Sequence, residues 1–226
     1  MRVVKAVIFD LDGTLIDSLG DIHAALNTML STRGDKSLDL ATVRGFIGKG
    51  SSNLVMQCLE ALELPNDNAA HAKALDEFLA IYTAGSATKT ALFDGVKTAL
   101  NRLSSQGVRL GICTNKPLGP TRVVLDHFGL TDFFEVIVGG DQLASRKPDP
   151  EMLQHAMIAL GADHCMFVGD SEIDSATAIA AGQAFALFTR GYRKASIETL
   201  APTYFFDDFN DFDSIAEQFF ADTPKR

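Results

Sequence analysis

Six polar side chains follow short apolar runs of the sequence, and one lysine precedes a predicted helix. They are Asp10, Asp12, Thr114, Asn115, Asp170 and Asp174, together with Lys147. Magnesium prefers oxygen ligands, usually one or two carboxylates completed by water and substrate phosphate. Asp10, Asp170 and the backbone carbonyl of Asp12 could supply such ligands. These residue types therefore predict a magnesium-assisted reaction at phosphorus.

The phosphate of such a substrate needs positive charge and hydrogen-bond donors around it. A phosphate monoester dianion repels an attacking carboxylate, so the cation and Lys147 must neutralise its charge. Thr114, Asn115 and the backbone amides that follow Asp10 could hold the phosphate oxygens. The predicted phosphate-binding residues are therefore Thr114, Asn115 and Lys147.

Asp10 and Asp12 stand two residues apart, which permits one to act as nucleophile and the other as acid. Alternate residues of an extended strand face the same way, so both side chains can point toward one cavity. We expect Asp10 to attack phosphorus and to form an aspartyl-phosphate. We expect Asp12 to protonate the leaving alkoxide and then to deprotonate the water that hydrolyses the intermediate.

This convergence requires a sheet whose strands end at one edge. Apolar runs of strand length (3–9, 108–113, 134–138, 165–168 and 184–188) alternate with helical stretches (95–106, 118–128, 150–160 and 173–181). Near-continuous apolar strands are typical of a parallel sheet buried on both faces. The alternation predicts an α/β fold with a doubly wound parallel sheet, whose ligands bind outside the carboxyl ends of the strands. We also expect Asp94 to cap the first helix, and residues 204–220 to form a last edge strand and helix.

The interval between residues 14 and 94 shows no convincing buried strand. It contains helical patterns at 21–30, 52–62 and 70–82 instead. A crossover between parallel strands needs only a dozen or so residues, so this interval indicates an inserted helical subdomain. We predict an α/β core of residues 1–15 and 89–226 and a helical insertion of residues 16–88.

Composition and charge exclude several classes of partner. The net charge of −9 argues against a broad basic face for nucleic acid or an anionic membrane. The three cysteines are far apart and odd in number, which favours a reducing compartment over a disulfide framework. The first apolar run lacks a signal-peptide pattern, and no segment approaches the length of a membrane span. We therefore expect a cytoplasmic protein with no nucleic-acid or membrane partner.

Four short motifs of this chain resemble those of the haloacid dehalogenase superfamily. They are Asp10-Leu-Asp-Gly-Thr-Leu, Thr114-Asn-Lys, Lys147-Pro and Gly169-Asp-Ser-Glu-Ile-Asp174. The resemblance extends over residues 5–220, and the helical insertion resembles the type 1 cap of that superfamily. Segments 9–18, 92–96 and 146–148 closely resemble the phosphoglycolate phosphatase branch.

The resemblance implies a role for each motif residue. It implies that Asp10 is the nucleophile, Asp12 the acid and base, Thr114 and Lys147 the phosphate contacts, and Asp170 a magnesium ligand. It further implies Asp174 as a metal-site carboxylate that acts directly, through water or through Lys147. Dehalogenases and phosphonatases of the superfamily lack an acid at the position of Asp12, and sugar phosphomutases usually carry Val where Thr14 stands here.

The insertion contains a glycine-rich segment, residues 44–52, that could determine substrate choice. It is not a P-loop, because that motif needs Lys after its second glycine. The resemblance suggests a loop over the active site, in which Arg44 or Lys49 meets a carboxylate of the substrate. Both could instead be solvated surface charges in a turn. His23 could touch substrate or simply pack within the insertion.

The function predicted from these observations is a Mg²⁺-dependent phosphatase for a small phosphorylated metabolite, with 2-phosphoglycolate as the leading substrate. The alternatives are a phosphatase for a sugar phosphate or pyrophosphate, and a phosphomutase. A phospho-acceptor signalling domain, which also uses an acidic cluster and a lysine on an α/β sheet, is the non-enzymatic alternative. The sequence is compatible with a monomer or a homodimer.

Overall fold

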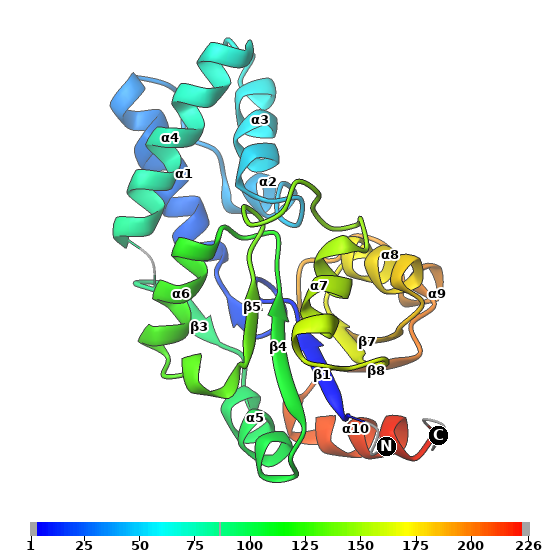
Figure 1. Ribbon diagram of the computed structural model, residues 1–226. Helices are drawn as coiled ribbons and strands as arrows, with labels where there is room; N and C mark the ends of the chain where they lie inside the picture. Colours follow the sequence, from blue (N-terminus) through cyan, green and yellow to red (C-terminus); the bar gives the residue numbers. More distant parts are fainter. Residues whose placement is uncertain (1–3, 86, 223–226) are drawn as a thin grey trace.

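The computed structural model describes residues 4–85 and 87–222, and its centre is a six-stranded sheet (Figure 1). The strand order is β5-β4-β1-β6-β7-β8, and all neighbouring strands are parallel. The strands are β1 (Ala6–Phe9), β4 (Arg109–Cys113), β5 (Val136–Val138), β6 (Met166–Gly169), β7 (Ala184–Phe188) and β8 (Tyr204–Phe206). This sheet confirms the predicted fold class, although the first strand begins at Ala6, and Val3 lies outside the described residues.

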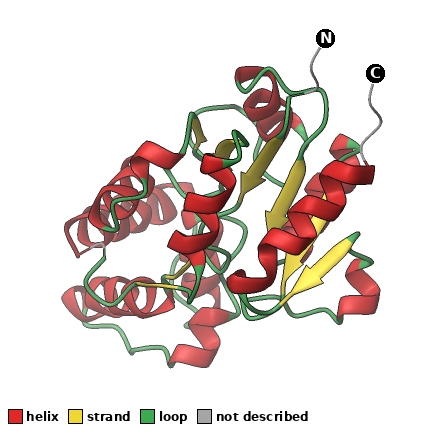
Figure 2. Cartoon of the chain, turned by 90° about the horizontal axis from the view of Figure 1, so that it is seen from below, coloured by secondary structure: helices red, strands yellow, loops and turns green. Residues whose placement is uncertain are grey.

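Helices cover both faces of the sheet, so the core has three layers (Figures 1 and 2). One face packs on α5 (Val96–Ser105), α6 (Leu118–His127) and α10 (Phe212–Asp222). The other packs on α7 (Glu151–Ala159), α8 (Glu172–Ala181) and α9 (Ile197–Leu200). Two short 3-10 helices, Thr131–Phe133 and Phe209–Asp211, complete the connections. Each sheet face is therefore buried under its own apolar cluster, as near-continuous apolar strands require.

The start of α5 differs from its prediction. Asp94 does not cap this helix; the N-cap residue is Gly95, at a φ of +81°. A side chain at Gly95 would also press on the backbone nitrogen of Asn210. Glycine is required there because both the positive φ and the close approach exclude a Cβ atom.

The phenylalanine-rich C-terminal segment packs on the core, as predicted. The buried rings of Phe188, Phe206, Phe209 and Phe212 form five tilted or edge-to-face pairs, with ring centroids 4.9–5.8 Å apart. Such geometries are favourable for aromatic pairs beyond the area they bury. Phe205 faces outward on the edge strand and is 61% exposed.

Four helices form a separate layer over the carboxyl end of the sheet (Figure 1). They are α1 (Leu19–Arg33), α2 (Leu40–Arg44), α3 (Ser51–Ala61) and α4 (Asn68–Gly85), and we call them the helical insertion. They surround an apolar cluster of their own, in which Leu26, Met29 and Phe78 are fully or almost fully buried. Its limits as a domain, predicted at residues 16–88, stay a prediction.

Two linkers join the insertion to the core. They form a small antiparallel pair of β2 (Ile16–Asp17) and β3 (Ala91–Leu92). Buried Asp21 of α1 accepts hydrogen bonds from the backbone nitrogens of Lys89 at 2.8 Å and Thr90 at 3.0 Å. The outgoing and returning segments are thus held side by side. Among the described residues, no helix has the length and hydropathy needed to cross a membrane.

Candidate active site

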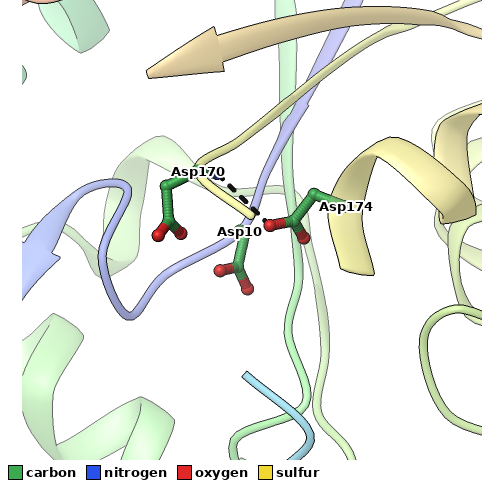
Figure 3. A group of neighbouring side chains, drawn as sticks. All are labelled: Asp10, Asp170 and Asp174. Carbon is green, nitrogen blue, oxygen red and sulfur yellow. Dashed lines mark hydrogen bonds between the residues drawn. The ribbon is translucent and has the colours of Figure 1, made fainter. Parts of the chain in front are cut away.

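Three carboxylates from separate segments meet at the carboxyl edge of the sheet (Figure 3). Asp10 follows β1, Asp170 follows β6, and Asp174 lies in the first turn of α8. All three are buried, and they offer ligand oxygens that lie within 4.8 Å of one another. The central strands β1 and β6 pair directly, so the residues that follow them emerge side by side.

Asp170 is fixed by hydrogen bonds from two loops. The Thr14 hydroxyl donates to its Oδ1 at 3.1 Å, and the backbone N–H of Tyr192 donates to its Oδ2 at 2.5 Å. A Cβ atom on Gly191 or Gly13 would overlap the Asp170 side chain. Glycine at these two positions lets the backbone close around the carboxylate.

Asp174 takes part in the capping box that begins α8. Its Oδ2 accepts from the backbone nitrogens of Asp170 at 3.2 Å and Ser171 at 3.1 Å, and from the Ser171 hydroxyl at 2.6 Å. The dashed line in Figure 3 marks the bond between Asp170 and Asp174. Helix formation therefore aims this carboxylate at the site, because its capping partners fix one of its two oxygens.

Lys147 connects two of the carboxylates. Its buried ammonium lies 2.8 Å from Oδ1 of Asp10 and 2.6 Å from Oδ1 of Asp174. Burial by itself lowers the pKa of Lys147, but Asp10 and Asp174 outweigh it and hold the pKa above its usual range. The lysine is therefore a permanent positive charge beside the predicted nucleophile.

The cluster carries more negative charge than Lys147 can balance. Burial raises the pKa of Asp10 to about 6, and Asp174 adds to the rise while Lys147 opposes it. Burial likewise raises the pKa of Asp170 well above its usual range, with repulsion from Asp174 and Asp10 adding to it. Closely spaced carboxylate oxygens in charge surplus are suitable ligands for Mg²⁺, so the residues present fit this ion.

Asp12 is bound to a second lysine, Lys116, for which no role is predicted from the sequence. The buried Lys116 ammonium lies 2.9 Å from Oδ1 and 3.2 Å from Oδ2 of Asp12. It also donates to the hydroxyl of Tyr82, from α4, and lies 4.6 Å from the centre of that ring. Burial raises the pKa of Tyr82 to about 12, so its hydroxyl keeps its proton. The helical insertion thus reaches the predicted acid through Tyr82 and Lys116.

A cavity that is partly open to solvent lies between the carboxyl edge of the sheet and the insertion. Its floor consists of residues that follow β1 and β4, namely Asp10, Asp12, Thr114, Asn115 and Lys116. Its other walls come from the insertion and consist of Ile22, Ile47, Gly48, Gly50, Ser51, Leu54, Phe78 and Tyr82. Lys116 is the only positively charged side chain among these described lining residues. An anionic substrate in this cavity would therefore meet Lys116.

Thr114 and Asn115 both line the cavity, but the Asn115 side chain also has structural partners. Its Nδ2 donates to the backbone oxygens of Gly48 and Lys147, each at 3.0 Å, and its Oδ1 accepts from the nitrogen of Lys147 at 3.0 Å. The Thr114 hydroxyl accepts from the nitrogen of Lys116 at 3.2 Å. Asn115 thus ties the lysine loop to the insertion, while Thr114 stands beside the two aspartates.

The two charged residues predicted to read the substrate lie outside the cavity lining. Lys49 is exposed between Gly48 and Gly50, which do line the cavity. Arg44 is exposed and donates from Nη2 to the backbone oxygen of Gly191 at 2.6 Å. His23 lies within the insertion, where its Nε2 is 3.0 Å from the backbone oxygen of Leu38.

The chain is similar to a known protein family, to curated proteins and to solved structures. The profile of the haloacid dehalogenase-like hydrolases matches residues 7–188. Phosphoglycolate phosphatase of Cereibacter sphaeroides is 46% identical over 197 residues, which is 87% of this chain and 90% of the relative. Phosphoglycolate phosphatase of Rhodobacter capsulatus is 41% identical over 220 residues, 95% of this chain and 98% of the relative. A crystal structure described as a predicted phosphoglycolate phosphatase from Haemophilus somnus superposes with a TM-score of 0.88, at 30% identity over 94% of this chain and 97% of that one.

Proposed function

Because the chain belongs to the haloacid dehalogenase-like hydrolase family, we propose that it is a Mg²⁺-dependent phosphatase that hydrolyses 2-phosphoglycolate. The names of its relatives support this substrate. The observation that carries the proposal is that two aspartates of the cavity lining each have a buried lysine as partner: Asp10 is bound to Lys147, which lies outside the lining, and Asp12 is bound to Lys116. Two carboxylates beside two fixed cations suit a reaction in which a dianionic phosphate must approach an anionic nucleophile.

The proposed reaction has two steps. A carboxylate oxygen of Asp10 attacks phosphorus, the bond from phosphorus to the substrate oxygen breaks, and Asp12 gives its proton to the departing glycolate oxygen. Asp12 then takes a proton from a water molecule that attacks phosphorus. The bond from phosphorus to Asp10 breaks, inorganic phosphate is released, and both aspartates return to their starting states.

The remaining site residues would neutralise and orient the phosphate. Lys147, the Thr114 hydroxyl and Asn115 would contact its oxygens, and the Asn115 side chain would also hold the lysine loop in place. Asp10, Asp170 and the backbone carbonyl of Asp12 would hold Mg²⁺, with Asp174 in support. The ion, when bound, withdraws charge from the phosphate oxygens.

The substrate's carboxylate also needs a cation. We assign this contact to Lys116, because it is the positive side chain of the described cavity lining. A contact from Arg44 or Lys49 stays a prediction, since both are exposed in this arrangement of the loop. The helical insertion would act as a cap that admits substrate when open and excludes bulk water when closed.

The setting of the enzyme is part of the same proposal. Cys58, Cys113 and Cys165 are buried free thiols, which supports a reducing, cytoplasmic location. The substrate is a small phosphorylated metabolite, with no nucleic-acid or membrane partner, and the enzyme would act as a monomer or homodimer.

The decisive experiment is a kcat/KM survey of purified protein against 2-phosphoglycolate, sugar phosphates, pyrophosphate and p-nitrophenyl phosphate, with Mg²⁺ and with EDTA. We expect the highest kcat/KM for 2-phosphoglycolate in Mg²⁺, and no activity toward any of these esters in EDTA. A better sugar phosphate or pyrophosphate would overturn the substrate assignment. Transfer of phosphate to a second hydroxyl of the substrate would indicate a phosphomutase. A stable phosphoprotein without turnover would indicate a signalling domain.

A further inference from the structure

Tyr192, in the loop after β7, contacts three separate parts of the molecule. Its backbone N–H donates to Asp170 Oδ2 at 2.5 Å, and its hydroxyl reaches the N-terminus of α1. Its ring belongs to the apolar cluster of the helical insertion, although the residue is part of the core. One residue, through its backbone on one side and its side chain on the other, thus joins the predicted metal site to the insertion.

The hydroxyl of Tyr192, although distant in the sequence, accepts hydrogen bonds from the first backbone N–H groups of α1. Ser18 occupies the N-cap position of α1 but makes no side-chain capping bond, and its own hydroxyl is buried without a partner. The Tyr192 oxygen instead accepts from the backbone nitrogens of Ser18 at 2.9 Å and Leu19 at 3.1 Å, and its proton goes to Asp17 Oδ1 at 2.7 Å. The Leu19 N–H also donates to Asp17 Oδ1, at 3.2 Å. The first free N–H groups of a helix need such acceptors.

A second attachment binds the same loop to the end of α2. The Arg44 guanidinium lies 5.4 Å from the centre of the Tyr192 ring and donates to the backbone oxygen of Gly191 at 2.6 Å. The ammonium of Lys194 donates to the backbone oxygen of Gly45 at 2.5 Å. The loop 191–194 therefore holds the insertion both where α1 begins and where α2 ends.

These two ends lie next to the walls of the cavity. Ile22, one turn into α1, and Ile47, three residues beyond α2, both line it. On its other side the loop packs against Asp170, where a Cβ atom on Gly191 has no room. A change in the Tyr192 contacts would therefore move the cavity wall relative to the carboxylates.

We propose that Tyr192 is a positioning residue that fixes the helical insertion relative to Asp170 and so determines which phosphate esters fit the cavity. The inference rests on the proposed function, since it concerns the specificity of the same site. Misplacement of a substrate by about 1 Å costs up to about 10²-fold in rate. The loss should therefore be greatest for the substrate that the closed cavity fits best.

The test compares Tyr192→Phe with Tyr204→Phe, which removes a hydroxyl from the edge strand β8, away from the insertion. In Tyr192→Phe we expect kcat/KM for 2-phosphoglycolate to fall about 10- to 100-fold and that for bulky p-nitrophenyl phosphate to fall much less. The Mg²⁺ concentration for half-maximal activity should stay unchanged, because the backbone bond to Asp170 remains. Lys194→Met, which removes the bond from the loop to Gly45, should change the specificity ratio in the same direction. Tyr204→Phe should match the wild type.

Hydrogen exchange provides a measurement that does not depend on the substrate. The amide of Ser18 should exchange at least about tenfold faster in Tyr192→Phe than in wild type or Tyr204→Phe, because it loses the tyrosine hydroxyl as its acceptor. The Leu19 amide keeps Asp17 Oδ1 as an acceptor and should change less. If 2-phosphoglycolate is not a substrate of the wild type, the proposed function fails, and the best ester of the survey takes its place in the ratio. The Tyr192 inference is overturned if the folded variant keeps the wild-type specificity ratio, if both esters lose rate equally, or if exchange at Ser18 is unchanged.

Discussion

Each of the two aspartates proposed to act at phosphorus has its own buried lysine. Lys147 holds Asp10 against Asp174, and Lys116 holds Asp12 against Tyr82. The two proposed roles have different surroundings. The proposed nucleophile, Asp10, shares its lysine with Asp174 of the predicted metal site, whereas the proposed acid, Asp12, shares its lysine with Tyr82 of the helical insertion. The proposed closure of the insertion would therefore affect the proposed acid without displacing the proposed nucleophile.

The role of Asp12 predicts a dependence on the leaving group. Asp12→Ala should lower kcat/KM for 2-phosphoglycolate about 10²- to 10⁴-fold, because its alkoxide needs a proton as it leaves. The loss for p-nitrophenyl phosphate should be far smaller, since its leaving group is stable as an anion. Steady-state kinetics with both esters provide the comparison. Equal losses would contradict the assignment of Asp12 as the acid.

Lys116 can be tested separately from Asp12 with two alkyl esters. Lys116→Met should lower kcat/KM for 2-phosphoglycolate at least about tenfold more than for ethyl phosphate, because only the former carries a carboxylate. Both esters need the acid equally, so loss of Asp12 positioning cancels in this ratio. Lys49→Ala serves as the comparison for the exposed loop. An unchanged ratio in Lys116→Met would mean that the lysine acts only on Asp12, and a changed ratio in Lys49→Ala would confirm the loop contact.

Site residues that follow the end of a strand can be predicted from the sequence. Site residues that the helical insertion brings to the sheet edge are harder to predict. Asp10, Asp170 and Lys147 could be placed because parallel strands end at one edge. Lys116 could have been found by the same reasoning, since it follows Thr114 and Asn115 directly. Tyr82 could not, because its approach depends on how α4 packs over the sheet.

At the level of elements, periodicity predicts the long helices and the buried strands. It gives no signal for α2, which has five residues and is stabilised locally by Asp39, whose carboxylate accepts from the nitrogen of Thr42 at 2.8 Å. The strands β2 and β3 have two residues each and are likewise too short for a pattern. These short elements depend on contacts between distant segments, such as those of Asp21.

Asp21 should make a large contribution to the free energy of unfolding. Besides the two backbone bonds, its carboxylate accepts from the Thr90 hydroxyl at 2.5 Å. Asp21→Ala leaves these donors buried without an acceptor and should cost about 2–3 kcal/mol in urea unfolding. Asp21→Asn keeps one acceptor oxygen and should lose less. Asp76→Ala, on the exposed surface of α4, is the control. If all three variants lose a similar amount of unfolding free energy, the hydrogen bonds of Asp21 do not stabilise the fold.

Across the whole molecule, the active-site charge surplus should make stability depend on pH and on Mg²⁺. The pKa of Asp10 is raised to about 6 in the folded protein, whereas an unfolded chain loses this proton near 3.8. Between these values the unfolded state ionises first, so wild-type stability should fall relative to Asp10→Asn as the pH rises from about 4 to about 6. The difference should reach about 2–3 kcal/mol and then stay constant.

Urea unfolding of both proteins in EDTA from pH 4.5 to 7.5 measures this difference, with Asp163→Asn as an exposed control before β6. Above pH 6, Mg²⁺ should raise the unfolding free energy of the wild type more than that of Asp10→Asn, because the ion gains most from an ionised ligand. Asp10→Asn should also lose at least about 10³-fold in turnover while remaining folded. If the unfolding free energies of the two proteins change in parallel with pH, the pKa of Asp10 is not raised by folding. If Mg²⁺ stabilises both proteins equally, Asp10 is not a ligand of the ion.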